Sequence, residues 1–202
     1  MGEGNMWDFV QRVKENLARG GGYPANRDVY EAKDKLMEAM LRHWYFDDLG
    51  KWTWWLSLVL TIIPLIIWWK IVDRKRLLEI TVYGLLANIT ATFLDVIGSE
   101  LVLWSYPDRL LPNLPRLLPI DYVVVPVAYM LIYQYFPKWK DFVIAMTVLS
   151  LIFSFVAEPL LVLLNMYELH YWQYWYSLPI YFAIGVGLRI FLEALLRQQI
   201  KE

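Results

Sequence analysis

Three carboxylates interrupt the apolar part of the chain: Asp95, Asp121 and Glu158. A charged side chain inside a bilayer costs about 2.5–3.5 kcal/mol on insertion scales, so such residues usually face the interior of a helix bundle or water. Carboxyl groups that approach one another in an apolar setting resist ionising together, and a carboxyl that stays protonated can act as a general acid. We therefore predict that these three residues are catalytic and face one shared cavity.

The predicted depth of the carboxylates supports this convergence. At about 1.5 Å per helical residue, Asp95 lies about 27 Å along its helix from Leu77, close to the far membrane surface. Asp121 opens the next apolar segment from that same side, and Glu158 lies in the same half of the segment that follows. Pro159 removes a backbone donor next to Glu158, which frees a carbonyl one turn earlier.

Two further polar groups are candidate binding residues. Asn88 belongs to a polar stripe along one face of the segment that carries Asp95, although hydrogen-bonded packing explains such a stripe equally well. Arg189 lies about 18 Å into the last apolar segment, which predicts a position near the bilayer midplane. Glu193 follows one turn later and can pair with it, so a structural ion pair is the alternative interpretation of Arg189.

Composition excludes several other functions. Of the 202 residues, 58% are hydrophobic, 17% are aromatic and 19% are charged, with a net charge of −1. The chain has no Cys and only two His. It therefore has no thiol chemistry, no disulfide and no bulk positive charge for nucleic acid. Because the spacing of the acids also carries no metal-binding motif, we predict no metal ion, no cofactor and no nucleic-acid partner.

The elements that must position these residues are apolar segments long enough to cross a bilayer as helices, which takes about 20 residues each. Their continuous apolarity differs from the alternation of a membrane barrel. The predicted fold class is all-α: a polytopic membrane helix bundle with five transmembrane helices, an amphipathic N-terminal region and no β-sheet. The five predicted spans are residues 52–72, 77–103, 118–136, 142–165 and 177–196.

Residues 1–51 are predicted to form an amphipathic N-terminal helical region, and residues 52–202 the transmembrane domain. Two helices are expected in the first region, near residues 7–17 and 28–45, joined by the glycines at 20–22. The second helix has an apolar face that we expect to dock on the bundle or on the membrane surface. That face consists of Met37, Met40, Leu41, Trp44 and Tyr45.

The distribution of basic residues predicts the orientation, because Lys and Arg concentrate in cytoplasmic loops. The loops after the first and third spans are basic, whereas the intervening loops hold only Arg109 and Arg116. The basic loops are therefore predicted to face the cytoplasm. The predicted location is the bacterial plasma membrane, with the C-terminus on its cytoplasmic side. The residues that decide this are Lys70, Arg74, Lys75, Arg76, Lys138 and Lys140.

Two stretches of the sequence look alike. Each has an acid late in a span, then an aromatic loop, then Leu-Pro-Ile at the start of the next span. The acids are Asp95 and Glu158, and the Leu-Pro-Ile runs begin at Leu118 and Leu178. The second and third spans and the fourth and fifth spans are thus predicted to be two copies of one helical hairpin, as internal repeats in membrane bundles often are.

At these residues the chain resembles the lycopene cyclase domain, the membrane type found in bacteria, archaea and fungi. That family shows an acid late in one span, a Trp-x-Tyr loop, an Arg-Ile-Leu-like run, and Pro-x-Glu-Glu at the next span. Tyr122 replaces the second Glu of the family pair, and Tyr181 stands at the corresponding acidic position of the second copy. The chain also resembles an uncharacterised group of small multi-spanning proteins of spore-forming Firmicutes. The matching residues are Asp95, Trp104-Ser105-Tyr106, Arg109-Leu110-Leu111 and Pro119-Ile120-Asp121-Tyr122.

The resemblance implies redox-neutral cyclisation of an isoprenoid polyene, which needs an acid, an aromatic lining for a carbocation, and a base. Asp121 would be the acid, and Asp95 or Glu158 would tune it or act as the base. An interfacial aromatic belt is the alternative interpretation of each lining residue. The lining candidates are Trp104, Tyr106, Tyr122, Trp172, Trp175 and Tyr181.

Two other functional classes stay open. One is a non-catalytic membrane scaffold, or a subunit that binds a lipid or a partner, which the loss of the second family acid favours. The other is a small oligomeric transporter built on Asp95, Glu158 and Arg189. The expected partner is a membrane lipid or isoprenoid, and the oligomeric state is left open.

Overall fold

The computed structural model describes residues 5–18, 26–112 and 118–199. The predicted hinge at glycines 20–22 and the loop residue Arg116 lie outside the described residues. Nearly all the described chain is helical, which confirms the all-α class. The helices are α1 (Met6–Ala18), α2 (Asn26–His43), α3 (Trp52–Ile71), α4 (Leu77–Glu100), α5 (Val125–Tyr135), α6 (Trp139–Ile152), α7 (Glu158–Leu163) and α8 (Tyr174–Gln199).

Four helical segments are long and apolar enough to cross a membrane. They are Trp52–Ile71, Arg74–Glu100, Trp139–Leu163 and Tyr174–Gln198. The protein is therefore an integral membrane protein. The predicted count of five differs, because the remaining apolar helix, Ile120–Tyr135, is shorter than a standard span. Its end is set by Pro137, since the residue before a proline disfavours helical geometry.

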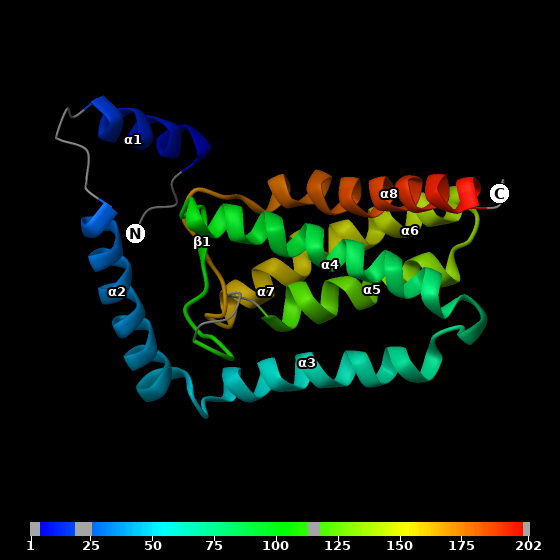
Figure 1. Ribbon diagram of the computed structural model, residues 1–202, viewed down its shortest axis with the longest axis horizontal. Helices are drawn as coiled ribbons and strands as arrows, with labels where there is room; N and C mark the ends of the chain where they lie inside the picture. The colour runs from blue at the N-terminus through cyan, green and yellow to red at the C-terminus, as the bar shows by residue number, and fades with distance from the viewer. Residues whose placement is uncertain (1–4, 19–25, 113–117, 200–202) are drawn as a thin grey trace.

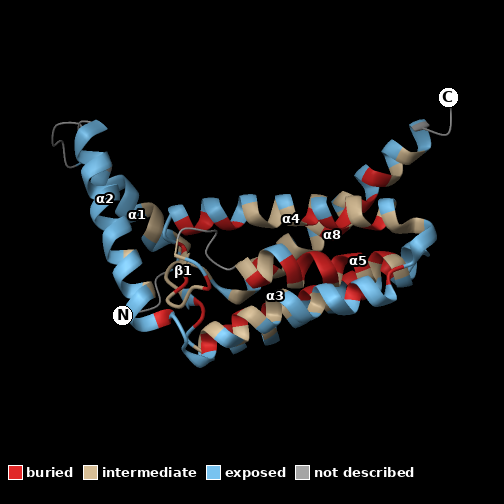
Figure 2. Ribbon diagram, turned by 60° about the horizontal axis from the view of Figure 1, so that its bottom comes forward, coloured by how far each residue is buried: buried red, intermediate tan, exposed pale blue. Residues whose placement is uncertain are grey.

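Helices α3, α4, α5, α6 and α8 run side by side, with the two termini at opposite ends of the molecule (Figure 1). Helix α4 packs against α5 and α8, and α6 packs against α8. Helix α5 carries the most buried face (Figure 2). In contrast, only 6% of the most apolar stretch of α3 is buried, and its apolar side chains are largely exposed. The buried residues of α5 are Val125, Pro126, Val127, Tyr129, Met130 and Tyr133.

Buried tyrosines connect the core helices through backbone carbonyls. The Tyr83 hydroxyl of α4 donates to the carbonyl of Gly185 at 2.8 Å, and the Tyr129 hydroxyl of α5 donates to the carbonyl of Tyr181 at 2.7 Å. Both phenols are fully buried, so their hydroxyls need such partners. These bonds fix the rotation of α8, and with it the direction of the Tyr181 side chain.

Two π-helical turns interrupt the helices that carry the acids. One spans Ile120–Val124 before Pro126, and the other spans Phe153–Ala157 before Pro159. A proline ring clashes with the carbonyl four residues earlier, and one wide turn relieves that clash. Asp121 lies inside the first of these turns and Glu158 directly follows the second.

The structure supports the duplicated hairpin with matching helix ends. Val102 and Asn165 each adopt a left-handed conformation, with φ of 58° and 56°, seven residues after Asp95 and Glu158 respectively. Each following residue donates to a carbonyl five residues back at 2.9 Å, which is the Schellman pattern of a helix end. The two copies therefore share geometry as well as sequence order.

The two loops then pair with each other as a short ribbon. Strand β1 (Trp104–Ser105) is antiparallel to β2 (Glu168–Leu169), with Ser105 opposite Glu168. Ser105 and Glu168 occupy equivalent positions in the two copies, so the ribbon pairs the repeat with itself. This corrects the expectation of no β-sheet: two extended residues per loop pair because the matching helix ends bring the loops together.

The N-terminal helices lie outside the bundle (Figure 1). Helix α2 has no buried residue, and its apolar face stays largely uncovered (Figure 2). The expected docking on the bundle is confined to the turn that follows, where Trp44 donates its indole N–H to the carbonyl of Leu110 at 3.1 Å. Contact of the α2 face with the membrane surface stays a prediction.

Candidate functional site

Asp95, Asp121 and Glu158 line one cavity of about 220 Å³ beside the β1–β2 ribbon. The structure thus brings together the three acids that the sequence analysis selected. Four predicted aromatic residues also line it, and the rest of the wall is mostly aliphatic. The lining residues with functional groups or rings are Trp104, Tyr106, Tyr167, Trp172, Ser177 and Tyr181.

Asp95 is buried and bonded to two aromatic donors. The indole N–H of Trp104 donates to its Oδ1 at 2.9 Å, and the hydroxyl of Tyr106 donates to the same oxygen. Trp104 reaches Asp95 only because Gly98 has no side chain: a Cβ there would lie 2.0 Å from the indole ring. Hydrogen bonds to a carboxylate favour its charged form, so this arrangement suits an ionised Asp95.

Asp121 has a different environment. Its Oδ2 is buried and has no hydrogen-bond partner among the residues that the structure describes. Asp121 is also close enough to Asp95 for their charges to interact. Leaving a buried oxygen without a donor is costly if the group is ionised, so the protonated acid suits this position.

Glu158 is buried and accepts a hydrogen bond at Oε1 from the Tyr181 hydroxyl at 2.9 Å. Within the described part of the chain, its Oε2 has no hydrogen-bond partner. Ser177, which also lines the cavity, accepts a bond from the indole N–H of Trp172 at 2.9 Å. The wall around Glu158 therefore combines hydrogen-bonded aromatic side chains with one buried carboxyl oxygen that has no hydrogen-bond donor among the described residues.

Two loop tyrosines close the end of the cavity near the ribbon. The rings of Tyr106 and Tyr167 stack with centroids 5.4 Å apart. Burial raises the pKa of both phenols well above the ordinary value, and the nearby carboxylates add to that rise. Both are therefore neutral hydrogen-bond donors at physiological pH. Sequence reasoning missed Tyr167, although the repeat contained the signal: it follows Asn165 by two residues, as Trp104 follows Val102.

Besides Arg189, three predicted binding residues do not line the cavity. Tyr122 is exposed on the outer side of its π-helical turn, and Trp175 is exposed and donates to Gln173 Oε1 at 2.6 Å. Asn88 lies next to a cavity residue: its side-chain amide donates to the backbone carbonyl of Asp121 at 3.2 Å. Asn88 thus holds the turn that carries Asp121, and Tyr122 points away because neighbours in a helix diverge by about 100°.

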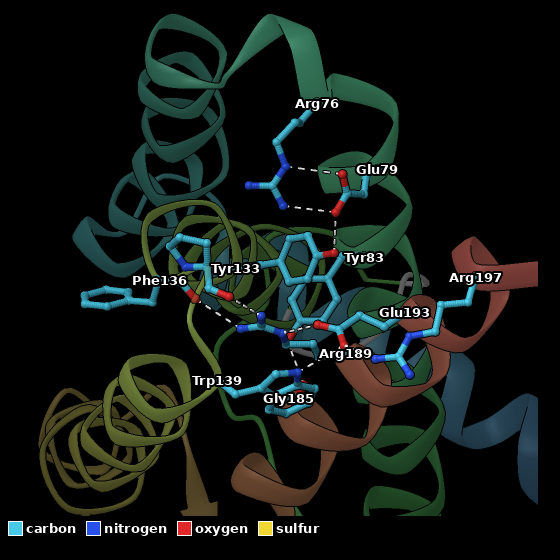
Figure 3. Close-up of polar contacts among 11 residues, drawn as sticks. Arg76, Glu79, Tyr83, Tyr133, Phe136, Trp139, Gly185, Arg189, Glu193 and Arg197 are labelled. Atoms are coloured by element: carbon cyan, nitrogen blue, oxygen red, sulfur yellow. Dashed lines mark hydrogen bonds and ion pairs between the residues drawn. The ribbon is translucent and has the colours of Figure 1, made fainter. Parts of the chain in front are cut away.

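Arg189 does not line the cavity; its guanidinium points toward Phe136 and Glu193 (Figure 3). It is buried, and its guanidinium donates to the carbonyls of Phe136 and Pro137 at 3.0 and 2.5 Å. It also donates to Glu193 at 2.8 Å, so the predicted ion pair is confirmed. Arg189 thus lies beside the turn between α5 and α6 and not in the cavity wall, so its binding role and its depth in the membrane stay predictions.

The chemistry available to the cavity follows from these contacts. Asp95 accepts two hydrogen bonds, and Asp121 has a buried oxygen without a donor among the described residues. Glu158 accepts a hydrogen bond from the Tyr181 phenol. Among the described residues, no group of three His, Asp or Glu side chains is arranged to hold a metal ion. The carboxyl groups of the cavity are of the type that can transfer protons to and from an apolar ligand.

Comparison of the chain with protein-family models, with curated proteins and with solved structures gives no match.

Proposed function

We propose that the protein is a membrane enzyme that protonates and cyclises an isoprenoid polyene, as the resemblance to the lycopene cyclase domain implies. The observation that carries this proposal is the contrast between Asp121 and Asp95. Asp121 presents a buried oxygen without a donor to an apolar cavity, and Asp95 beside it accepts bonds from Trp104 and Tyr106. Two neighbouring carboxyl groups in such different environments suit an acid and a base.

The roles follow from the contacts. Asp121 transfers its proton to a terminal alkene carbon, the resulting carbocation is attacked by a second double bond of the same chain, and a ring forms. A proton lost from the ring passes to Asp95 or Glu158. The product is an isomer of the substrate, so no oxidant, reductant or cofactor is consumed.

The aromatic wall suits a cationic intermediate. The rings of Trp104 and Trp172 meet edge to face with centroids 4.9 Å apart, and both line the cavity. Electron-rich ring faces stabilise a nearby positive charge by about 0.5–2 kcal/mol each. Their indole N–H groups are bonded to Asp95 and Ser177, which keeps these two rings fixed.

The size of the cavity indicates how a long substrate would bind. Its 220 Å³ equals about seven water molecules of roughly 30 Å³ each, enough for one end of an isoprenoid. Leu94 and Ile97 line the cavity and are also 38% and 42% exposed on the lipid-facing side of α4. The rest of the isoprenoid would pass between Leu94 and Ile97 and remain in the bilayer.

The proposed enzyme has five spans, with Ile120–Tyr135 as the short central one and the C-terminus in the cytoplasm of a bacterial plasma membrane. The supporting observation is the burial of α5 among the longer helices. Cysteine labelling tests the topology, because the chain contains no native Cys. One cysteine is placed in the α3–α4 turn or in the α5–α6 turn and treated with a membrane-impermeant reagent. If these cysteines are labelled only after cell lysis, the proposed topology is supported. If they are labelled in intact cells, the proposed topology is contradicted.

The test of the function is Asp121→Asn in the full chain, reconstituted in vesicles that contain lycopene or a shorter polyene. We expect cyclised product from the wild-type protein and a loss of about 10²–10⁴-fold in the variant, the range for a general acid. Glu168→Gln, a change on the exposed edge of the ribbon, is the matched control and should retain turnover. Absence of product from the wild-type protein with every polyene would overturn the proposal.

A non-catalytic lipid- or partner-binding subunit is the second candidate. It is favoured by Tyr181, which replaces the acid of the second copy and donates to Glu158. In that case a polyene or lipid binds without conversion, and Asp121→Asn is neutral or stabilising because it removes a buried acid that lacks a donor.

A further inference from the structure

Two grooves open at the end of the bundle opposite the cavity, and they differ in charge. The first, of about 360 Å³, lies between the start of α4 and the end of α8. The second, of about 440 Å³, lies between α5 and α6. Both have aliphatic walls, so both can hold a lipid chain. The first also contains Lys75 and Arg76 with Glu79, whereas the only charged residue of the second is Asp141.

The charge of the first groove is positive after its internal ion pair is counted. Arg76 binds Glu79 through two nitrogens at 3.0 and 3.2 Å, and Glu79 also accepts from the Tyr133 hydroxyl (Figure 3). The Glu79 carboxylate is thus engaged by Arg76 and by Tyr133. No carboxylate of the described residues lies within ion-pair distance of the Lys75 ammonium, so its charge is uncompensated at the mouth.

The groove lies where lipid headgroups are expected. Trp69 is exposed at the adjoining end of α3, and Arg74 covers its ring at 4.1 Å. Exposed Trp side chains next to Lys and Arg are typical of the membrane–water interface. Leu78 and Leu195 line the groove and are exposed, while Leu192, also in the lining, is buried.

We propose that this groove, defined by Lys75, Arg76, Leu78, Val82, Leu192 and Leu195, is a binding site for an anionic phospholipid. The phosphate is held by Lys75 and by the outer side of Arg76, and one acyl chain lies against Leu78 and Leu195. Basic pockets between helices at a membrane surface bind anionic headgroups in this way. The site is separate from the cavity, and the inference does not depend on the proposed enzymatic function.

The test uses brominated lipids as quenchers of a bimane label on the full chain in phosphatidylcholine vesicles. The chain has no native Cys, so Leu78→Cys places a single label in the basic groove and Ile144→Cys places one in the acidic groove. We expect brominated phosphatidylglycerol to occupy the first groove roughly fivefold better than brominated phosphatidylcholine, as about 1 kcal/mol per basic residue predicts. We expect no such preference at Ile144→Cys.

Adding Lys75→Gln to Leu78→Cys should remove most of the preference, whereas Lys138→Gln, a basic residue of the same membrane face outside the groove, should leave it intact. Excess inorganic phosphate should not displace the lipid, because the acyl chain contributes to binding. Displacement would mean that the site recognises a phosphate group alone and would overturn the inference of a lipid site. Equal quenching by both lipids, an equal preference at both grooves, or a preference that survives Lys75→Gln would each overturn the inference.

Native mass spectrometry of the unlabelled protein gives a second measure: phosphatidylglycerol should be retained by the wild-type chain and lost from Lys75→Gln.

Discussion

The Tyr181 hydroxyl donates to Oε1 of Glu158 at 2.9 Å, and this pair occupies the positions that Asp121 and Asp95 hold in the first hairpin. The two copies of the repeat thus place different chemistry at equivalent points of one cavity. In the second copy a phenol supplies the donor that the acid needs. In the first copy a second acid stands there, and the donors to Asp95 come from the loop residues Trp104 and Tyr106.

Tyr181→Phe should destabilise the protein, because it removes this donor from a buried carboxyl while leaving the ring in place. We expect a loss of about 1–3 kcal/mol in the free energy of unfolding, the usual cost of an unsatisfied buried group. The measurement is chemical unfolding in detergent micelles. Tyr135→Phe, at an exposed tyrosine, is the control and should change little. A combined Tyr181→Phe/Glu158→Gln variant should recover part of the loss, and purely additive effects would contradict the pairing.

Val102→Gly should stabilise the first hairpin. Val102 has φ of 58°, a conformation that costs a residue with a Cβ about 1–2 kcal/mol, and its side chain is 45% exposed, so little packing is lost. After the extra backbone entropy of glycine is subtracted, a gain of roughly 0.5–1 kcal/mol remains. Asn165→Gly is the matched control, because asparagine tolerates this conformation and the change should be close to neutral. A destabilised Val102→Gly variant would mean that the helix end has another geometry.

Arg189→Met should destabilise the bundle without altering ligand binding in the cavity. The guanidinium is buried, donates to Phe136, Pro137 and Glu193, and its loss leaves those oxygens without their donor. We expect a loss of about 3 kcal/mol, as for one partner of a buried ion pair. Arg197→Met is the control: Arg197 is 77% exposed and lies 3.8 Å from Glu193, so its removal should cost well below about 1 kcal/mol. A change in polyene binding with unchanged stability would restore Arg189 to the site.

Asp48 should make stability depend on pH. It is buried at the turn before α3, and desolvation raises the pKa of its carboxyl above the ordinary value. The folded state therefore binds the proton more tightly than the unfolded state, so the destabilisation by ionised Asp48 is complete above the folded pKa and is relieved as the pH falls through it. Nε2 of His43 lies 3.3 Å from Oδ1 of Asp48.

The measurement for Asp48 is the thermal midpoint between about pH 8 and about pH 4. Asp48→Asn should raise the midpoint most at the alkaline end, and its advantage over the wild-type chain should shrink as the pH falls. Asp47→Asn, at the exposed neighbour, is the control and should follow the wild-type profile. A constant difference across the whole range would show that Asp48 is not the titrating group.

Much of the candidate site could be predicted from the sequence. The spacing of Asp95, Asp121 and Glu158 along apolar helices set their depth, and the repeat related Asp95 to Glu158. Depth is a one-dimensional property, because it depends only on residue count and helical rise. The meeting of the three acids at one cavity could therefore be expected before any helix was placed beside another.

The all-α class, the membrane location and the loop aromatics were likewise properties of the sequence itself, since continuous apolar runs leave the backbone no partners in lipid except its own. Only the tertiary structure decided which side chains face the cavity. The π-helical turn of Ile120–Val124 turns Tyr122 outward, Gly98 admits the Trp104 ring to Asp95, and the carbonyls of Phe136 and Pro137 hold Arg189 at the far end. Helix rotation and axial position are set by contacts between residues as many as 102 positions apart, such as Tyr83 and Gly185, and local hydropathy contains no information about them.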